Sequence, residues 1–82
     1  MNKILITLVV PMIDKEYDLF IPISKKIYVA KKLLIEAVNE LSEGHYPIKD
    51  KCTLLSTTGI PFDDKKTIKE SQIKNGDRII LI

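Results

Sequence analysis

Residues 3–22 read KILITLVVPMIDKEYDLFIP, and this stretch holds two apolar runs separated by a short break. The first run, residues 3–10, is rich in Ile, Leu and Val, which favour strands. The second run, residues 16–21, alternates apolar and polar side chains, and the break at residues 11–15 has turn composition. Pro22 ends the second run because proline has no N–H to donate to a sheet. The stretch therefore predicts a β-hairpin.

The alternation places the side chains of this hairpin on two faces, because successive side chains of a strand point to opposite sides. One face is apolar throughout, and we expect it to pack against the core. Its members are Ile4, Ile6, Leu8, Val10, Tyr17, Leu19 and Ile21. The other face mixes apolar and polar side chains. Its members are Leu5, Thr7, Val9, Glu16, Asp18 and Phe20.

A helix is expected to follow the hairpin, and a loop over residues 45–50 to follow the helix. Ser24 can cap its start, and Gly44 can end it in the left-handed conformation. Between them apolar residues recur at helical spacing, widened by Leu33 and Ala37. The main stripe consists of Ile27, Ala30, Leu34, Val38 and Leu41. Lysines stand in the first half and glutamates in the second, against the helix macrodipole, so burial of the stripe must stabilise this helix.

The remainder of the chain predicts two short strands separated by turns. Residues 52–57 form the expected third strand, and residues 78–82 form the last one. A turn is expected at residues 58–61, and residues 63–71 are irregular or form one helical turn. Residues 75–77, Asn-Gly-Asp, form a tight turn because Asn and Gly tolerate positive φ.

The expected elements define the fold class. One helix must cover one face of one small sheet, because no other element can bury either apolar stripe. The first and last strands are expected side by side at the centre of that sheet. The prediction is an α+β protein, a β-grasp in which a mixed four- to five-stranded sheet packs on one helix, within a single domain over residues 1–82.

The chain resembles ubiquitin-like domains over nearly its whole length. The segment from Ile21 to Ile27 is similar to the strand exit, cap and first buried helix position of that family. Later positions run in the family's order and spacing without a gap. They are Leu55 through Gly59, Phe62, Thr67-Ile68 and Ile73.

A narrower resemblance is to the YukD/EsaB family, small ubiquitin-like proteins of type VII secretion systems in Gram-positive bacteria. It is carried by Tyr17-Asp18-Leu19-Phe20-Ile21-Pro22 before the helix and by Ile73-Lys74-Asn75-Gly76-Asp77-Arg78-Ile79 before the last strand. The resemblance implies a non-catalytic adaptor that stays in the cytoplasm and is recruited to the inner face of the membrane by a partner. The implied partner is a protein of the secretion machine, either its membrane-anchored pseudokinase-like component or its ATPase.

Two other functions stay open at this point. Conjugated modifiers and sulfur carriers of this fold activate a C-terminal Gly-Gly, whereas this sequence is expected to finish inside a strand at Ile82. Ile60 also stands where ubiquitin carries a lysine after the third-strand glycine, here Gly59. A modifier or carrier is therefore disfavoured. The second alternative is a small subunit of a larger enzyme complex.

The composition of the chain excludes further classes of function. The 82 residues carry a net charge of +2, which is too little by itself to imply a nucleic-acid partner. A single cysteine permits neither an intrachain disulfide nor a cysteine-clustered metal site, which fits a reducing compartment. The apolar run over residues 4–10 is too short for a membrane span, and we expect a strand there rather than a signal peptide. Direct membrane insertion is not expected.

Few residue clusters suggest chemistry. We expect the lone His45 to be a loop residue and the lone Cys52 to be a packed thiol, neither a metal ligand nor a nucleophile. The acidic groups at residues 14–18 and 63–64 lack calcium-loop spacing and predict solvated turns. No catalytic residue, metal or cofactor is predicted. Basic residues gather near the helix start, and we interpret them as a solvated face or as a contact for an acidic protein. They are Lys25, Lys26, Lys31 and Lys32.

The second face of the sheet is the most informative feature for function. With Leu55 turned toward the helix, this outer face is more apolar than a half-exposed antiparallel sheet should be. Contiguous exposed apolar surface marks interaction sites, and ubiquitin, which the chain resembles, uses this face for recognition. The candidate protein-binding residues are Leu5, Val9, Phe20, Leu54, Ile80 and Ile82, with Arg78 and Lys3 at the rim. A one-residue slip would exchange Leu54 for Leu55, and the pattern leaves open whether a second copy closes over the face to form a homodimer.

Overall fold

The opening hairpin forms as its alternation predicts. In the computed structural model, which describes residues 2–48 and 51–82, β1 (Lys3–Val10) and β2 (Lys15–Pro22) pair antiparallel along their whole length. A short 3₁₀ turn, η1 (Pro11–Ile13), joins them. Asp14 closes that turn at φ 53°, in the left-handed region that aspartate tolerates.

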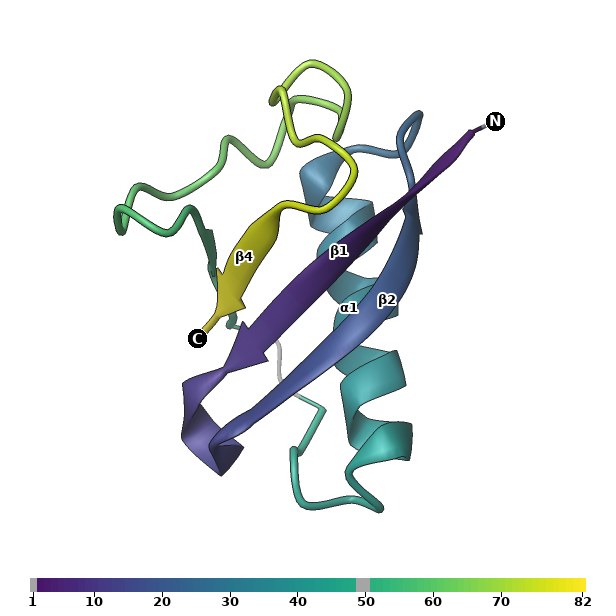
Figure 1. The fold of residues 1–82 in the computed structure, drawn as a ribbon. Helices are drawn as coiled ribbons and strands as arrows, with labels where there is room; N and C mark the ends of the chain where they lie inside the picture. The colour runs from purple at the N-terminus through teal and green to yellow at the C-terminus, as the bar shows by residue number, and fades with distance from the viewer. Residues whose placement is uncertain (1, 49–50) are drawn as a thin grey trace.

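Four strands form one sheet in the order β2-β1-β4-β3 (Figure 1). β4 (Arg78–Leu81) lies parallel to β1, and β3 (Leu54–Leu55) lies antiparallel to β4. The first and last strands are therefore neighbours at the centre, which confirms the predicted β-grasp arrangement. The sheet has four strands, within the predicted range of four to five, and an isolated bridge between Leu55 and Pro61 follows β3.

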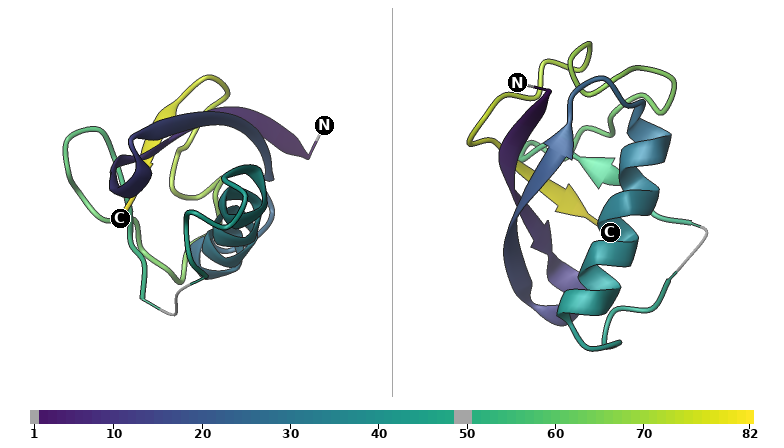
Figure 2. Two further views of the ribbon diagram at one scale, coloured as in Figure 1. Left: turned by 90° about the horizontal axis from the view of Figure 1, so that it is seen from below. Right: turned by 90° about the vertical axis from the view of Figure 1, so that its right-hand side faces the viewer.

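The helix α1 (Ile27–Leu41) covers one face of the sheet (Figure 2). The core lies between these two layers and is closed at one side by the segment that leads into β4. The fully or nearly buried apolar side chains are Ile6, Leu8, Val10, Ile21, Ile27, Ala30, Leu34, Ile35, Val38, Tyr46, Cys52, Leu54, Ile68, Ile73, Ile79 and Leu81. The expected core face of the hairpin is thus confirmed, with Ile4, Tyr17 and Leu19 only partly buried toward its edges.

The helix begins two residues later than the sequence predicts. Its N-cap is Lys26, not Ser24, and no side chain caps it. The backbone N–H groups of Ile27 and Tyr28 donate instead to the carbonyl oxygens of Lys66 and Asp64, at 2.8 and 3.3 Å. These donors would otherwise lack partners inside the helix. A loop distant in sequence therefore caps the helix start, which is the role predicted for Ser24.

The end of the helix is close to the predicted one. Ser42 is the C-cap, and Glu43 and Gly44 then take positive φ values of 55° and 84°. Gly44 thus adopts the left-handed conformation expected of it. Of the predicted loop over residues 45–50, residues 49–50 lie outside the described part of the chain.

The third strand is shorter than predicted, and its side-chain assignment was wrong. Leu54 stands opposite Leu81, whereas Leu55 stands opposite Ile80. Residues opposite each other in an antiparallel pair share a face. Because Leu81 is buried, Leu54 also points into the core, where it is 1% exposed. Leu54 therefore does not belong to the outer face, and Leu55 takes its place there.

The Asn75-Gly76-Asp77 turn holds β4 against β1. The Leu5 N–H donates to Asn75 Oδ1 at 2.8 Å, and the Gly76 N–H donates back to the Leu5 carbonyl at 2.7 Å. The Thr7 N–H donates to the Asp77 carbonyl at 2.9 Å. Gly76 has φ 89°, which glycine adopts without the steric cost of a Cβ. The predicted tight turn thus also extends the central pairing.

Paired alanine substitutions test the corrected register. Leu54→Ala should lower the free energy of unfolding by about 2–5 kcal/mol, because it leaves a cavity in the core. Leu55→Ala removes a half-exposed side chain and should cost about 1 kcal/mol or less. Urea denaturation followed by circular dichroism measures both values. Equal losses, or a larger loss for Leu55→Ala, would contradict this register.

Candidate protein-binding face

The outer face of the sheet is ordered in rows by the strand registers. Phe20 stands opposite Leu5, and Asp18 stands opposite Thr7, which in turn neighbours Arg78 on β4. The next row runs across all four strands. Its members are Glu16, Val9, Ile80 and Leu55.

A polar row divides this face into two apolar areas. The Thr7 hydroxyl donates to Asp18 Oδ1 at 2.8 Å. Arg78 reaches across β1 to Glu16, with its Nη2 2.7 Å from Glu16 Oε2. Both members of this ion pair are about half exposed, so the pair contributes little to stability. The sequence pattern did not foresee the division, because it depends on which polar residues the registers bring together.

The larger apolar area, here called the Ile80 patch, consists of Val9, Leu55, Ile80 and Ile82. Val9 and Leu55 flank Ile80 directly in the sheet. Ile82 lies two residues after Ile80 on the same face, just beyond the end of β4, and exchanges two backbone hydrogen bonds with Thr53, at 2.9 and 3.0 Å. Ile82 is 51% exposed, and the other three side chains are partly buried. The patch is therefore an apolar surface on rigid, hydrogen-bonded backbone.

The smaller area is a pair formed by Phe20 and Leu5 on neighbouring strands. Phe20 is 62% exposed, an unusual degree for a phenylalanine side chain. Lys3 lies one row beyond, opposite Pro22 at the end of the hairpin. Seven of the eight residues predicted for the outer face or its rim are thus on it, but the polar row divides their apolar members into two clusters. The exception is Leu54.

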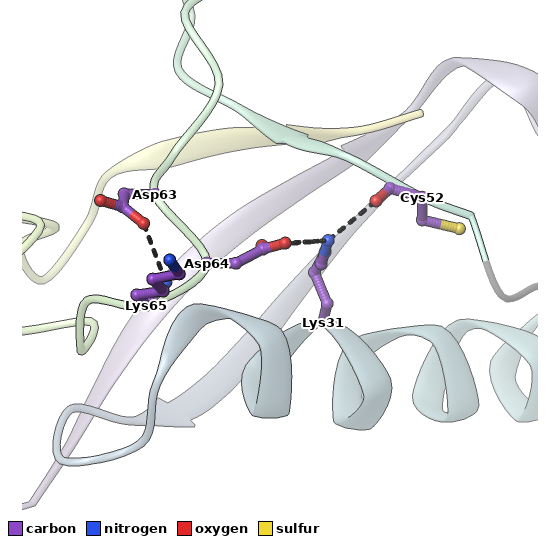
Figure 3. Close-up of polar contacts among 5 residues, drawn as sticks. All are labelled: Lys31, Cys52, Asp63, Asp64 and Lys65. Atoms are coloured by element: carbon purple, nitrogen blue, oxygen red, sulfur yellow. Dashed lines mark hydrogen bonds and ion pairs between the residues drawn. The ribbon is translucent and has the colours of Figure 1, made fainter.

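One lysine of the predicted basic patch has a structural place (Figure 3). Lys31 Nζ donates to the Cys52 carbonyl oxygen at 3.0 Å and lies 3.0 Å from Asp64 Oδ1. Its side chain is only 18% exposed. Lys31 therefore ties α1 to two segments that follow it, whereas Lys25, Lys26 and Lys32 are not buried in this way.

Cys52 is a packed thiol, as the sequence predicts. It is 8% exposed, and its Sγ lies 3.4 Å from the hydroxyl of the fully buried Tyr46. Burial raises the pKa of Tyr46 above its usual range, and the hydrogen bond with Cys52 adds to this effect. His45 is exposed on the loop after α1, with its Nδ1 2.6 Å from the Ser42 carbonyl oxygen. Each of the two residues has a local structural partner.

The described residues contain neither a cluster of metal-binding side chains nor a membrane-spanning helix. Over residues 2–48 and 51–82, no three His, Cys, Asp or Glu side chains gather closely enough to hold a metal ion. Within the same residues, no helix has both the length and the apolar character needed to cross a bilayer.

Solved structures with the same architecture include ubiquitin-like domains of secretion proteins. The EccD5 ubiquitin-like domain of Mycobacterium xenopi has a TM-score of 0.82 at 18% identity, with 100% of this chain and 94% of that chain covered. The ubiquitin-like domain of the Mycobacterium tuberculosis type VII secretion protein ECCD1 has a TM-score of 0.80 at 11% identity, with 100% and 99% covered. A chain of the MycP5-free ESX-5 inner membrane complex reaches 0.84 at 15% identity, but this protein spans only 21% of it.

These likenesses define the class of the protein. It has the ubiquitin-like β-grasp fold, as predicted. No family model and none of the curated proteins matches the sequence. At 11–18% identity the solved structures show the fold alone. Membership of the YukD/EsaB family therefore stays a prediction.

The burial of Cys52 has a measurable consequence. In the folded protein the thiol should react with Ellman's reagent at least about a hundredfold more slowly than in denaturant, because reaction requires opening of the core around Tyr46. The rate of thionitrobenzoate release with and without urea measures this ratio. Rapid reaction in the folded protein would contradict the packing described here.

Proposed function

We propose that this protein is a non-catalytic ubiquitin-like adaptor of a bacterial type VII secretion system, and that it binds a partner protein through the outer face of its sheet. The observation that carries the proposal is the Ile80 patch. An antiparallel sheet with one solvated face normally presents polar side chains there. Here apolar residues from three strands adjoin one another, and such surfaces mark interaction sites.

The surroundings of the patch support a specific contact. Stable interfaces have an apolar centre and a polar rim, with arginine enriched among the contacting residues. The Ile80 patch supplies the centre, and the exposed Arg78 and Glu16 stand beside it. We assign the Phe20–Leu5 pair and Lys3 to the periphery of the same contact, because the polar row separates them from the centre.

The partner is a protein of the secretion machine, its membrane-anchored pseudokinase-like component or its ATPase. Support comes from the likeness of the fold to the ubiquitin-like domain of the type VII secretion protein ECCD1 and to part of a chain of the ESX-5 inner membrane complex. In this proposal the domain works on the cytoplasmic side and is held at the membrane by its partner.

A pull-down from membranes of the source organism tests the proposal. Wild-type protein on a resin should retain a secretion-machine component, identified by mass spectrometry. Ile80→Asp should lower the retained amount about tenfold or more, because it places a charge in the centre of the contact. Phe20→Asp should lower it less, because Phe20 lies at the periphery.

Tyr28→Asp is the matched control, since Tyr28 is 48% exposed on α1, away from the outer face. It should leave retention unchanged. All three variants should keep thermal melts close to wild type, because none of the three side chains is fully buried. Retention that survives both Ile80→Asp and Phe20→Asp would overturn the outer-face proposal.

A further inference from the structure

β2 is an open edge of the sheet. β1 lies along one side of it, and among residues 2–48 and 51–82 no strand lies along the other (Figure 2, right). The strand is eight residues long and pairs with β1 without a bulge. An exposed edge of this length is a template on which a further strand can form. This surface is separate from the Ile80 patch.

The backbone groups that face the open edge follow from one hydrogen bond. The Ile23 N–H donates to the Asn2 carbonyl oxygen at 2.7 Å, just beyond the end of the paired strands. Bonded and non-bonded pairs alternate in an antiparallel ladder. Ile21, Leu19 and Tyr17 therefore direct their backbone groups to β1. The even-numbered residues of β2 direct their backbone groups to the open edge. They are Glu16, Asp18, Phe20 and Pro22.

An apolar flank of α1 lies beside this edge. Leu41 lines a depression together with Ile13 and Tyr17. Leu33 and Ala37 precede Leu41 at four-residue steps and so lie on the same side of the helix. Leu33 is 45% exposed, and Leu19 on β2 is partly buried. A strand added to β2 would find apolar partners for every second side chain.

The charges on the outer face of β2 determine which side chains an added strand should carry on that face. The even-numbered residues of β2 place Glu16 and Asp18 on the outer face. Arg78 compensates Glu16, but the partner of Asp18 is the neutral hydroxyl of Thr7. A basic side chain directly opposite Asp18 would therefore gain a cross-strand charge pair. The edge thus favours a segment that alternates apolar and basic residues.

We propose that β2 is a docking edge for an extended segment of a partner protein in which apolar residues alternate with Lys or Arg. The segment adds to the sheet as a strand beside β2. Its backbone bonds to the outward groups of Asp18 and Phe20, its apolar side chains contact Leu19 and Leu33, and its basic side chains face Asp18. A second copy of this chain is a poorer occupant, because its own β2 would bring further carboxylates to the same edge.

A synthetic peptide provides the probe. An acetylated peptide with the repeat Val-Lys-Val-Lys-Val should bind the protein in a fluorescence anisotropy titration, and the matched peptide with Glu in place of Lys should bind at least about tenfold more weakly. Hydrogen exchange should then slow at the amides of Asp18 and Phe20, which face the open edge in the free protein. Exchange at amides of the Ile80 patch should not change.

Substitutions separate backbone pairing from charge. Asp18→Pro removes both the outward N–H and the carboxylate, and proline is tolerated at an edge position whose N–H faces solvent. Asp18→Thr removes only the charge. Asp18→Pro should weaken binding about tenfold, and Asp18→Thr by a smaller factor. Leu33→Asp should also weaken binding, whereas Tyr28→Asp, on the opposite flank of α1, should not.

Three outcomes would overturn the proposal. One is the absence of saturable binding by the basic peptide. Another is binding that Asp18→Pro and Leu33→Asp leave unchanged while both variants remain folded by circular dichroism. The last is slowing of exchange at Asp18 and Phe20 that grows with protein concentration without peptide, which would assign the edge to a second copy. Leu33→Asp should not affect the membrane pull-down, so this proposal and the outer-face proposal fail independently.

Discussion

The parallel pairing of β1 with β4 is the constraint on which the rest of the structure depends. It joins Thr7 to Arg78, nearly the whole chain apart, and it puts both strands at the centre of the sheet. Parallel neighbours cannot be joined by a tight turn, so the intervening chain must cross one face of the sheet. α1 makes that crossing and buries most of its apolar stripe there, whereas Leu41 at its end stays 54% exposed. The turn that contains Gly76 then holds β4 in register through its hydrogen bonds with Leu5 and Thr7.

The same constraint accounts for the long segment between β3 and β4, which has little regular structure. Its backbone groups need partners, and several find them on distant elements. The carbonyl oxygens of Asp64 and Lys66 accept from the first turn of α1, and Asp64 also holds Lys31. The helix therefore needs no capping side chain, and its lysine-first, glutamate-last charge order is tolerated because burial outweighs the few tenths of a kcal/mol that each misplaced charge costs.

Two different surfaces are left for partners once the core is complete. The outer face offers side chains on a rigid sheet, with the Ile80 patch on one side of a polar row and Phe20 on the other. The free side of β2 offers backbone groups beside an apolar helix flank. The two surfaces meet at Asp18 and Phe20, whose side chains belong to the outer face and whose backbone groups face the edge. A partner at one surface therefore lies close to a partner at the other, and this domain has room for two contacts of different chemistry.

The sequence by itself determined the hairpin, its two faces, the helix and the β-grasp order, because an apolar run, an alternating run and a wide helical stripe admit few arrangements. It also determined that Cys52 is packed. Only the tertiary structure decided the side of Leu54, since two adjacent leucines carry no alternation and the parity came from the partner strand, where Leu81 is buried. Tertiary contacts likewise replaced Ser24 by carbonyls of a distant loop and divided the predicted binding face, because the sheet registers bring Asp18, Thr7 and Arg78 into one row. Local patterns fix which face a strand buries, and pairing between distant strands fixes which side chains become neighbours.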